Sequence, residues 1–150
     1  MKRGSSNTLL LDVNVLLALA WPHHQFFPTA RKRLESHRGR WATCALTELG
    51  FIRLSANPRV VGPHRTPADA AGLLAVMTAD PKHVYIEVMP SPVEATRSSS
   101  FNNILGHRQV TDLYLLGLAE RNHARLVTFD SRIRELAGGG DRVEVLSVPL

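Results

Sequence analysis

Two short apolar runs in this chain end abruptly at an aspartate, and this feature constrains the fold more than any other. The runs are TLLLD at 8–12 and ARLVTFD at 124–130. Each is short, apolar and compatible with a buried strand, so each predicts a strand that ends at its carboxylate. Helical patterns lie between such runs. Strands and helices in alternation predict a parallel sheet with helices on both faces.

The remaining elements are expected from periodicity, helix starts and turn residues. Strands are expected at 8–12, 41–44, 83–88, 124–130 and 143–148. Helices are expected at 14–21, 22–37, 45–56, 66–80, 111–124 and 131–136, with Pro22 opening the second. The stretch 90–106 leaves a short helix and a mobile loop both open. The fold class is therefore a three-layer α/β/α arrangement with a central, mostly parallel sheet, in a single domain over residues 1–150.

Composition excludes several classes of protein. Cys44 is the only cysteine, which excludes an internal disulfide and a cysteine-based zinc site. Asp12 and Asn14 interrupt the first apolar stretch, where the core of a signal peptide would carry no charge. No segment approaches the roughly 20 apolar residues that a membrane span needs. We therefore expect a cytoplasmic protein with no membrane partner.

The charge of the chain is positive and unevenly placed. Net charge is +5 and the sequence pI is about 10.1. Residues 1–65 hold ten Lys and Arg against three Asp and Glu, whereas residues 66–150 hold eight against ten. The densest run, RKRLESHRGR at 31–40, favours phosphate contacts and makes Arg31, Lys32 and Arg33 candidate RNA contacts. A solvated basic helix with no partner explains this run equally well.

Three aspartates are candidates for a site at the carboxyl ends of the strands, where ligands bind in open parallel sheets. Asp12 and Asp130 each end a predicted strand, although an aspartate before a helix is also a favoured N-cap. Asp112 opens a helix that is apolar nearly all round, and the helix dipole would favour an acid there in any case.

Glu48 is the fourth candidate acid. It lies inside the expected helix 45–56, on or beside its apolar stripe. A buried carboxylate needs a partner, so a salt bridge to an arginine and a bound metal both remain open. Together the four acids would repel one another unless a divalent cation relieved their charge, and oxygen ligands favour Mg²⁺ or Mn²⁺ over Zn²⁺.

The segments that carry these acids resemble those of PIN domains, and among PIN domains most closely those of the VapC toxins of toxin–antitoxin pairs. The matching segments occur in the family's order and span nearly the whole chain: LLLDVNVLLAL, ALTELGFIRL, HRQVTDLYLLGLA and LVTFD. The resemblance implies a metal-dependent endoribonuclease toxin in which metal-activated water hydrolyses RNA phosphodiester bonds and leaves a 5′-phosphate.

The resemblance also implies roles for individual residues and partners. One or two Mg²⁺ or Mn²⁺ ions would be held by four catalytic acids: Asp12, Glu48, Asp112 and Asp130. Asn14 and Thr128 would support that site by orienting ligands or water. The implied partners are transfer or ribosomal RNA, a cognate antitoxin whose C-terminal segment lies over the toxin, and a second copy in a homodimer. Arg108, four residues before Asp112, could contact a phosphate or lie on the surface.

Two other functions are compatible with parts of the sequence. A phosphotransfer domain that forms an aspartyl-phosphate would use Asp12 as nucleophile, but phosphatases of the haloacid dehalogenase type need a second aspartate where this chain has Asn14. A non-catalytic PIN-like scaffold that binds RNA or protein is the other alternative. The intact set of four acids argues against it.

Overall fold

The sheet is fully parallel and has five strands. The computed structural model describes residues 7–62, 65–95, 109–136 and 141–148. The strands are β1 (Thr8–Leu11), β2 (Trp41–Cys44), β3 (His83–Ile86), β4 (Ala124–Thr128) and β5 (Val143–Val145). Their order across the sheet is β3-β2-β1-β4-β5, with every neighbouring pair parallel. The two strands that precede Asp12 and Asp130 are therefore direct neighbours at the centre of the sheet.

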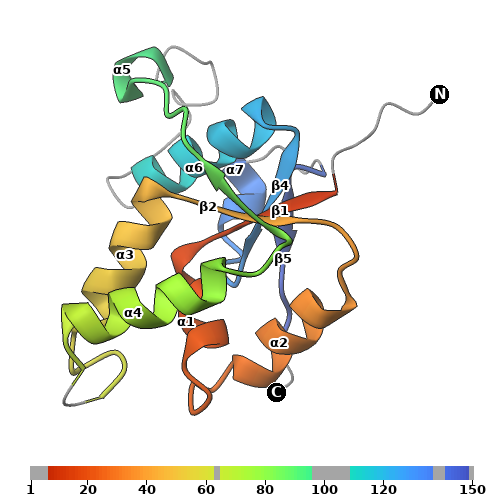
Figure 1. Ribbon diagram of the computed structural model, residues 1–150. Helices are drawn as coiled ribbons and strands as arrows, with labels where there is room; N and C mark the ends of the chain where they lie inside the picture. Colours follow the sequence, from red (N-terminus) through yellow and green to blue (C-terminus); the bar gives the residue numbers. More distant parts are fainter. Residues whose placement is uncertain (1–6, 63–64, 96–108, 137–140, 149–150) are drawn as a thin grey trace.

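Helices cover both faces of this sheet (Figure 1). They are α1 (Val13–Ala20), α2 (Phe27–Ser36), α3 (Ala45–Ser55), α4 (Pro67–Thr78), α5 (Pro92–Ala95), α6 (Val110–Arg121) and α7 (Ile133–Leu136). Side chains of α1 to α4 share one core cluster with Leu9 and Leu11, and those of α6 and α7 share a second with Leu10. The predicted three-layer α/β/α fold is confirmed.

The alternation within β1 explains why its sequence is apolar throughout. Successive side chains of a strand point to opposite faces. Both faces are covered by helices here, so Leu9, Leu10 and Leu11 are all buried although they belong to different clusters. A strand covered on both sides must be continuously hydrophobic.

The expected start of one helix and the expected end of another were wrong. The second helix begins at Phe27 rather than Pro22, because residues 21–26 form a turn in which the backbone N–H of His24 donates to the carbonyl of Trp21 at 2.8 Å. Pro28 then occupies the first turn of α2, where its missing N–H costs nothing. The helix expected to reach 124 ends at Arg121, because His123 adopts a positive φ of 53° that a helix cannot continue.

Within the stretch 90–106, for which a short helix and a mobile loop were both open, Pro92–Ala95 form the short helix α5, and residues 96–106 lie outside the described residues. In the described part of the chain, no helix combines the length and apolar character that crossing a membrane requires.

Candidate active site

Asp12 directly follows β1 and begins α1. Its Oδ1 accepts a hydrogen bond from the backbone N–H of Val13 at 2.8 Å, so it caps the helix. Its Oδ2 accepts a second from the hydroxyl of Thr128 at 2.8 Å, and the residue is only 8% exposed. From the sequence alone, Asp12 could be a helix cap or a site residue at the carboxyl end of the sheet. In the structure Asp12 caps α1 and also lies at that end.

Asn14 and Thr128 join the ends of β1 and β4. The side-chain amide of Asn14 donates to the Thr128 hydroxyl at 3.1 Å and accepts from the backbone N–H of Phe129 at 3.2 Å. The backbone N–H of Asp130 also donates to the Thr128 hydroxyl, at 3.1 Å. With one proton donated to Asp12 and two bonds accepted, that hydroxyl is fully used. This network fixes the backbone that carries Asp12 and Asp130.

Asp112 lies in the first turn of α6, within electrostatic range of both other aspartates. Burial, followed by the charges of Asp12 and Asp130, raises the pKa of Asp112 to about 6. Burial also raises the pKa of Asp12, and the charge of Asp130 adds to this, while hydrogen bonds from Thr128 and Val13 oppose it. The structure thus brings three predicted site acids into one cluster that is short of positive charge.

Arg132 contributes positive charge beside this cluster. Its Nε and Nη2 contact Oδ1 and Oδ2 of Asp130 at 3.0 and 2.8 Å, a bidentate pair that lowers the pKa of Asp130. Its charge also opposes the rise in the pKa of Asp112. We did not predict Arg132 from the sequence. Its position two residues after a strand-end aspartate was the available signal.

Glu48 lies in the first turn of α3 and has a different hydrogen-bond partner from the three aspartates. Its Oε2 accepts a hydrogen bond from the Thr43 hydroxyl at 2.6 Å, and that hydroxyl lies 2.8 Å from Nε2 of His83. The charges that shift the pKa values of Asp12 and Asp112 come from other aspartates and Arg132, not from Glu48. The sequence left open a salt bridge between Glu48 and an arginine. The structure instead shows the Thr43 hydroxyl as the partner of Glu48.

The donor set fits a hard divalent cation. Among the residues that the structure describes, no three His, Cys, Asp or Glu side chains are already arranged to hold a metal ion. The three aspartates nevertheless offer only oxygen atoms, and the raised pKa values of Asp12 and Asp112 indicate negative charge that burial and mutual repulsion disfavour. A divalent cation would relieve this repulsion with the ligand type that Mg²⁺ and Mn²⁺ prefer.

The basic residues expected to contact RNA are placed differently from one another. Arg31 pairs with Glu35 at 2.7 Å on the surface of α2. Arg33 makes a bidentate pair with Glu144 of β5, at 2.6 and 3.0 Å, and is therefore engaged in the fold. Lys32 is exposed. Arg108 lies outside the described residues.

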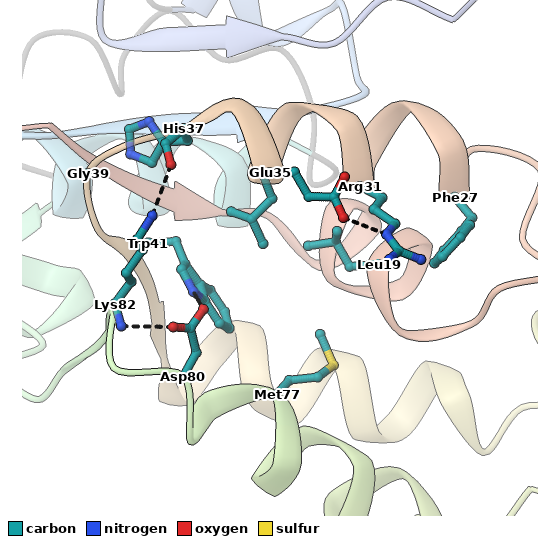
Figure 2. Close-up of a pocket in the computed structure, with 11 residues that line it drawn as sticks. Leu19, Phe27, Arg31, Glu35, His37, Gly39, Trp41, Met77, Asp80 and Lys82 are labelled. Carbon is teal, nitrogen blue, oxygen red and sulfur yellow. Dashed lines mark hydrogen bonds and ion pairs between the residues drawn. The ribbon is translucent and has the colours of Figure 1, made fainter.

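A groove of about 450 Å³ opens at the other end of the sheet, between α2 and the end of α4 (Figure 2). Trp41, the first residue of β2, and Lys82, which precedes β3, line it. Because the strands are parallel, this groove lies at their amino ends, whereas the aspartates lie at the carboxyl ends of β1 and β4. The groove therefore belongs to a different region from the acid cluster.

Comparisons with known proteins agree with this geometry. The PIN domain model matches residues 9–139. Ribonuclease VapC39 of Mycobacterium tuberculosis is 40% identical over 142 residues, covering 93% of this chain and 99% of the relative. Ribonuclease VapC38 of the same species is 42% identical over 129 residues, covering 85% and 89%.

Solved structures show the same fold at low sequence identity. The M. tuberculosis VapC20 structure, described as a Sarcin-Ricin loop cleaving toxin, has a TM-score of 0.66 at 14% identity and covers 93% of this chain and 99% of its own. A toxin–antitoxin complex from Klebsiella pneumoniae has a TM-score of 0.61 at 16% identity, with coverages of 91% and 96%. With the family match over most of its length, the chain belongs to the PIN domain family and, within it, to the VapC type.

Proposed function

We propose that this chain is a metal-dependent endoribonuclease and the toxin of a type II toxin–antitoxin pair. The observation that carries the proposal is the cluster of Asp12, Asp112 and Asp130, in which burial and mutual repulsion raise two of the three pKa values. Such shifts are typical of functional sites. The relatives named ribonuclease supply the reaction class.

Four acids are proposed to hold the cation. Asp12, Asp112 and Asp130 would bind Mg²⁺ or Mn²⁺, and Glu48 would supply the fourth carboxylate. A bound divalent cation lowers the pKa of a water molecule and offsets negative charge on the scissile phosphate.

The supporting residues fix where these acids stand. Hydrogen bonds that involve Asn14 and Thr128 fix the side chain of Asp12 and the backbone of Asp130. Arg132 pairs with Asp130, and its exposed guanidinium lies beside the acids, where it would be placed to contact a phosphate of the substrate.

The substrate and partners follow from the relatives. We propose transfer or ribosomal RNA as the substrate class, since VapC20 is described as cleaving the sarcin–ricin loop. The exposed Lys32 is the residue of the basic run that we retain as an RNA contact. A cognate antitoxin is proposed because the structural neighbours include toxin–antitoxin complexes. A homodimer of the toxin is part of the same proposal.

Cleavage of total cellular RNA by the purified protein tests the proposal. The protein is incubated with Mg²⁺, Mn²⁺ or EDTA beside an Asp12→Ala variant. Discrete fragments that require metal and disappear in the variant are expected, and sequencing their ends identifies the target. Equal cutting by both proteins, or none by either, would contradict a nuclease.

One observation favours a second candidate, the non-catalytic scaffold. The bidentate pair between Arg132 and Asp130 keeps one of the acids from a cation. Calorimetric titration with Mn²⁺ separates the two functions, because a scaffold without a working site shows no saturable binding that Asp12→Ala abolishes.

A further inference from the structure

A partly buried hydrogen-bond network holds the side chain of Glu48 through Thr43 and His83, two residues that have no part in the function proposed so far. Its centre is Thr43, the third residue of β2, whose side chain is fully buried at 0% exposure. The Thr43 hydroxyl lies 2.6 Å from Oε2 of Glu48 and 2.8 Å from Nε2 of His83. Thr43 and Glu48 are close in sequence, whereas His83 lies 40 residues from Thr43 and is brought in by the pairing of β2 with β3.

The protons of this network can be assigned by counting them. A hydroxyl has one proton to donate, and an ionised carboxylate can only accept. Thr43 therefore donates to Glu48, and its oxygen accepts from His83, whose Nε2 must carry a hydrogen. The direction of the Thr43 O–H bond is fixed by the partners on its two sides.

His83 is held in turn by the amino ends of the strands. It pairs in register with Trp41 in the parallel ladder, and the two rings are 4.7 Å apart at their centroids. The indole N–H of Trp41 donates to Oδ2 of Asp80 at 3.0 Å, and Oδ1 of Asp80 accepts the backbone N–H of Lys82 at 2.9 Å. Figure 2 shows Trp41, Asp80 and Lys82 at the edge of the groove. His83 is thus anchored by packing against Trp41, which is itself held by Asp80.

We propose that Thr43 is a positioning residue for Glu48, and that His83 orients the Thr43 hydroxyl for this task. The bond holds Glu48 through Oε2, so Glu48 would meet a cation with its carboxylate already oriented. A glutamate has three side-chain torsions, and fixing them before the cation arrives removes an entropic cost from binding. This inference rests on the proposed function, because it assumes that Glu48 is a metal-binding carboxylate.

The first test replaces Thr43 with valine, which keeps the shape and removes the hydroxyl. Mn²⁺ binding to the RNA-free protein is measured by calorimetry. Loss of an outer partner of a metal ligand typically weakens metal binding by roughly 10–100-fold, and we expect an effect in that range for Thr43→Val. Thr43→Ser keeps a hydroxyl and should restore affinity to near the wild-type value.

Thr47→Val is the matched control. Thr47 is equally buried, but its hydroxyl bonds the backbone N–H and carbonyl of Cys44 at 3.1 Å each and so stabilises the start of α3. We expect Thr47→Val to lower the melting temperature and leave Mn²⁺ affinity unchanged. If Thr47→Val weakens Mn²⁺ binding as much as Thr43→Val does, Thr43 acts only through stability and the inference is wrong.

A pair of His83 variants tests the other half of the network and remains available if Thr43→Val does not fold. Glutamine retains an N–H donor at the end of its side chain, whereas leucine has none. We expect His83→Leu to weaken Mn²⁺ binding, by less than Thr43→Val, and His83→Gln to bind more tightly than His83→Leu. Equal affinities in both variants and the wild type would overturn the role of His83.

The results separate this inference from the function on which it rests. A wild-type protein that neither binds Mn²⁺ nor cleaves RNA overturns both. If the wild type binds Mn²⁺ and cleaves RNA while Thr43→Val binds Mn²⁺ equally well, only the positioning role of Thr43 is overturned. Weaker Mn²⁺ binding in Thr43→Val, rescued by serine and absent in Thr47→Val, supports it.

Discussion

The two ends of the parallel strands treat charge in opposite ways. At the carboxyl ends of β1 and β4, negative charge exceeds positive, and the pKa values of Asp12 and Asp112 are raised. At the amino ends of β2 and β3, the pKa of Asp80 is lowered by a hydrogen bond from the backbone N–H of Lys82 and then by Trp41. The acids at the carboxyl ends repel one another, whereas the acid at the amino ends is stabilised by hydrogen bonds.

This difference indicates which end acts on a ligand. Side chains that only stabilise a fold are expected to be satisfied by their neighbours, whereas functional sites often break that rule and lower stability. Neutralising Asp112 at the carboxyl end should therefore remove activity and raise stability, whereas neutralising Asp80 at the amino end should do neither. The first and the last of three predictions test this contrast, and the second compares two basic residues of α2; they are given from the largest expected effect to the smallest.

Replacing Asp112 with asparagine should have opposite effects on activity and stability. Removing a ligand of the proposed cation removes several kcal/mol of transition-state stabilisation, so RNA cleavage should fall roughly a thousandfold. In the metal-free protein the same change should stabilise the fold at pH 7 by about 1 kcal/mol. In a fully buried group, a pKa rise of this size would correspond to a larger free energy. For Asp112, solvent screening and the lost interaction with the helix dipole reduce the stability gained.

The pH dependence of that stability change gives its sign. The pKa of Asp112 is raised in the folded protein from 3.8 to about 6. Its favourable contribution is therefore complete below pH 3.8 and is lost as the pH rises through 6. The stability gained by Asp112→Asn should grow between pH 4 and pH 7 in urea unfolding with EDTA present. A gain that is the same at every pH would contradict the electrostatic explanation.

The central strands and their terminal acids could be predicted from sequence, for a local physical reason. A strand buried on both faces must be apolar throughout, so an aspartate at its end, such as Asp12 or Asp130, is visible as a sharp change of composition. The parallel order then implies that both lie at one edge. The fold prediction is confirmed, and the assignment of the acids to a metal stays a proposal.

The features that sequence did not predict depend on tertiary contacts. Thr43 and His83 are 40 residues apart, and nothing local marks the hydrogen bond between them. The start of α2 was placed at Pro22 because proline often opens a helix, but Phe26 instead packs on Phe129 with ring centroids 4.9 Å apart. Long-range packing of this kind overrides local turn signals.

The second prediction separates a structural arginine from a surface lysine in the basic run of α2. Arg33 pairs bidentately with the half-buried Glu144, so Arg33→Gln should lower the free energy of unfolding by about 1 kcal/mol. Lys32→Gln should change stability by less than about 0.5 kcal/mol. If Lys32 contacts RNA, its variant should instead raise KM for RNA cleavage about two- to threefold at low salt and less at high salt.

Chemical unfolding of both variants, with cleavage assays at two salt concentrations, checks this prediction. Arg33→Gln is expected to keep the wild-type kcat at a temperature well below its melting point. A loss of cleavage in Arg33→Gln without a loss of stability would return Arg33 to the RNA-binding surface.

The smallest effect is expected for Asp80→Asn, at the satisfied end of the sheet. The pKa of Asp80 is lowered, so its contribution to stability is present above the unfolded value of 3.8 and is lost as the pH falls through the lower folded value. Because the side chain is exposed, solvent screening limits this contribution to about 0.5 kcal/mol at pH 7.

Asp80→Asn should therefore destabilise the protein slightly at pH 7 and by less as the pH falls below 3.8, with RNA cleavage unchanged. Its effect on stability has the opposite sign to that of Asp112→Asn, although each substitution removes one negative charge from the same sheet. Urea unfolding of both variants across pH 3–7 measures the two slopes side by side. If both variants stabilise the protein as the pH rises, the excess negative charge is a property of the whole molecule and not of one end of its strands.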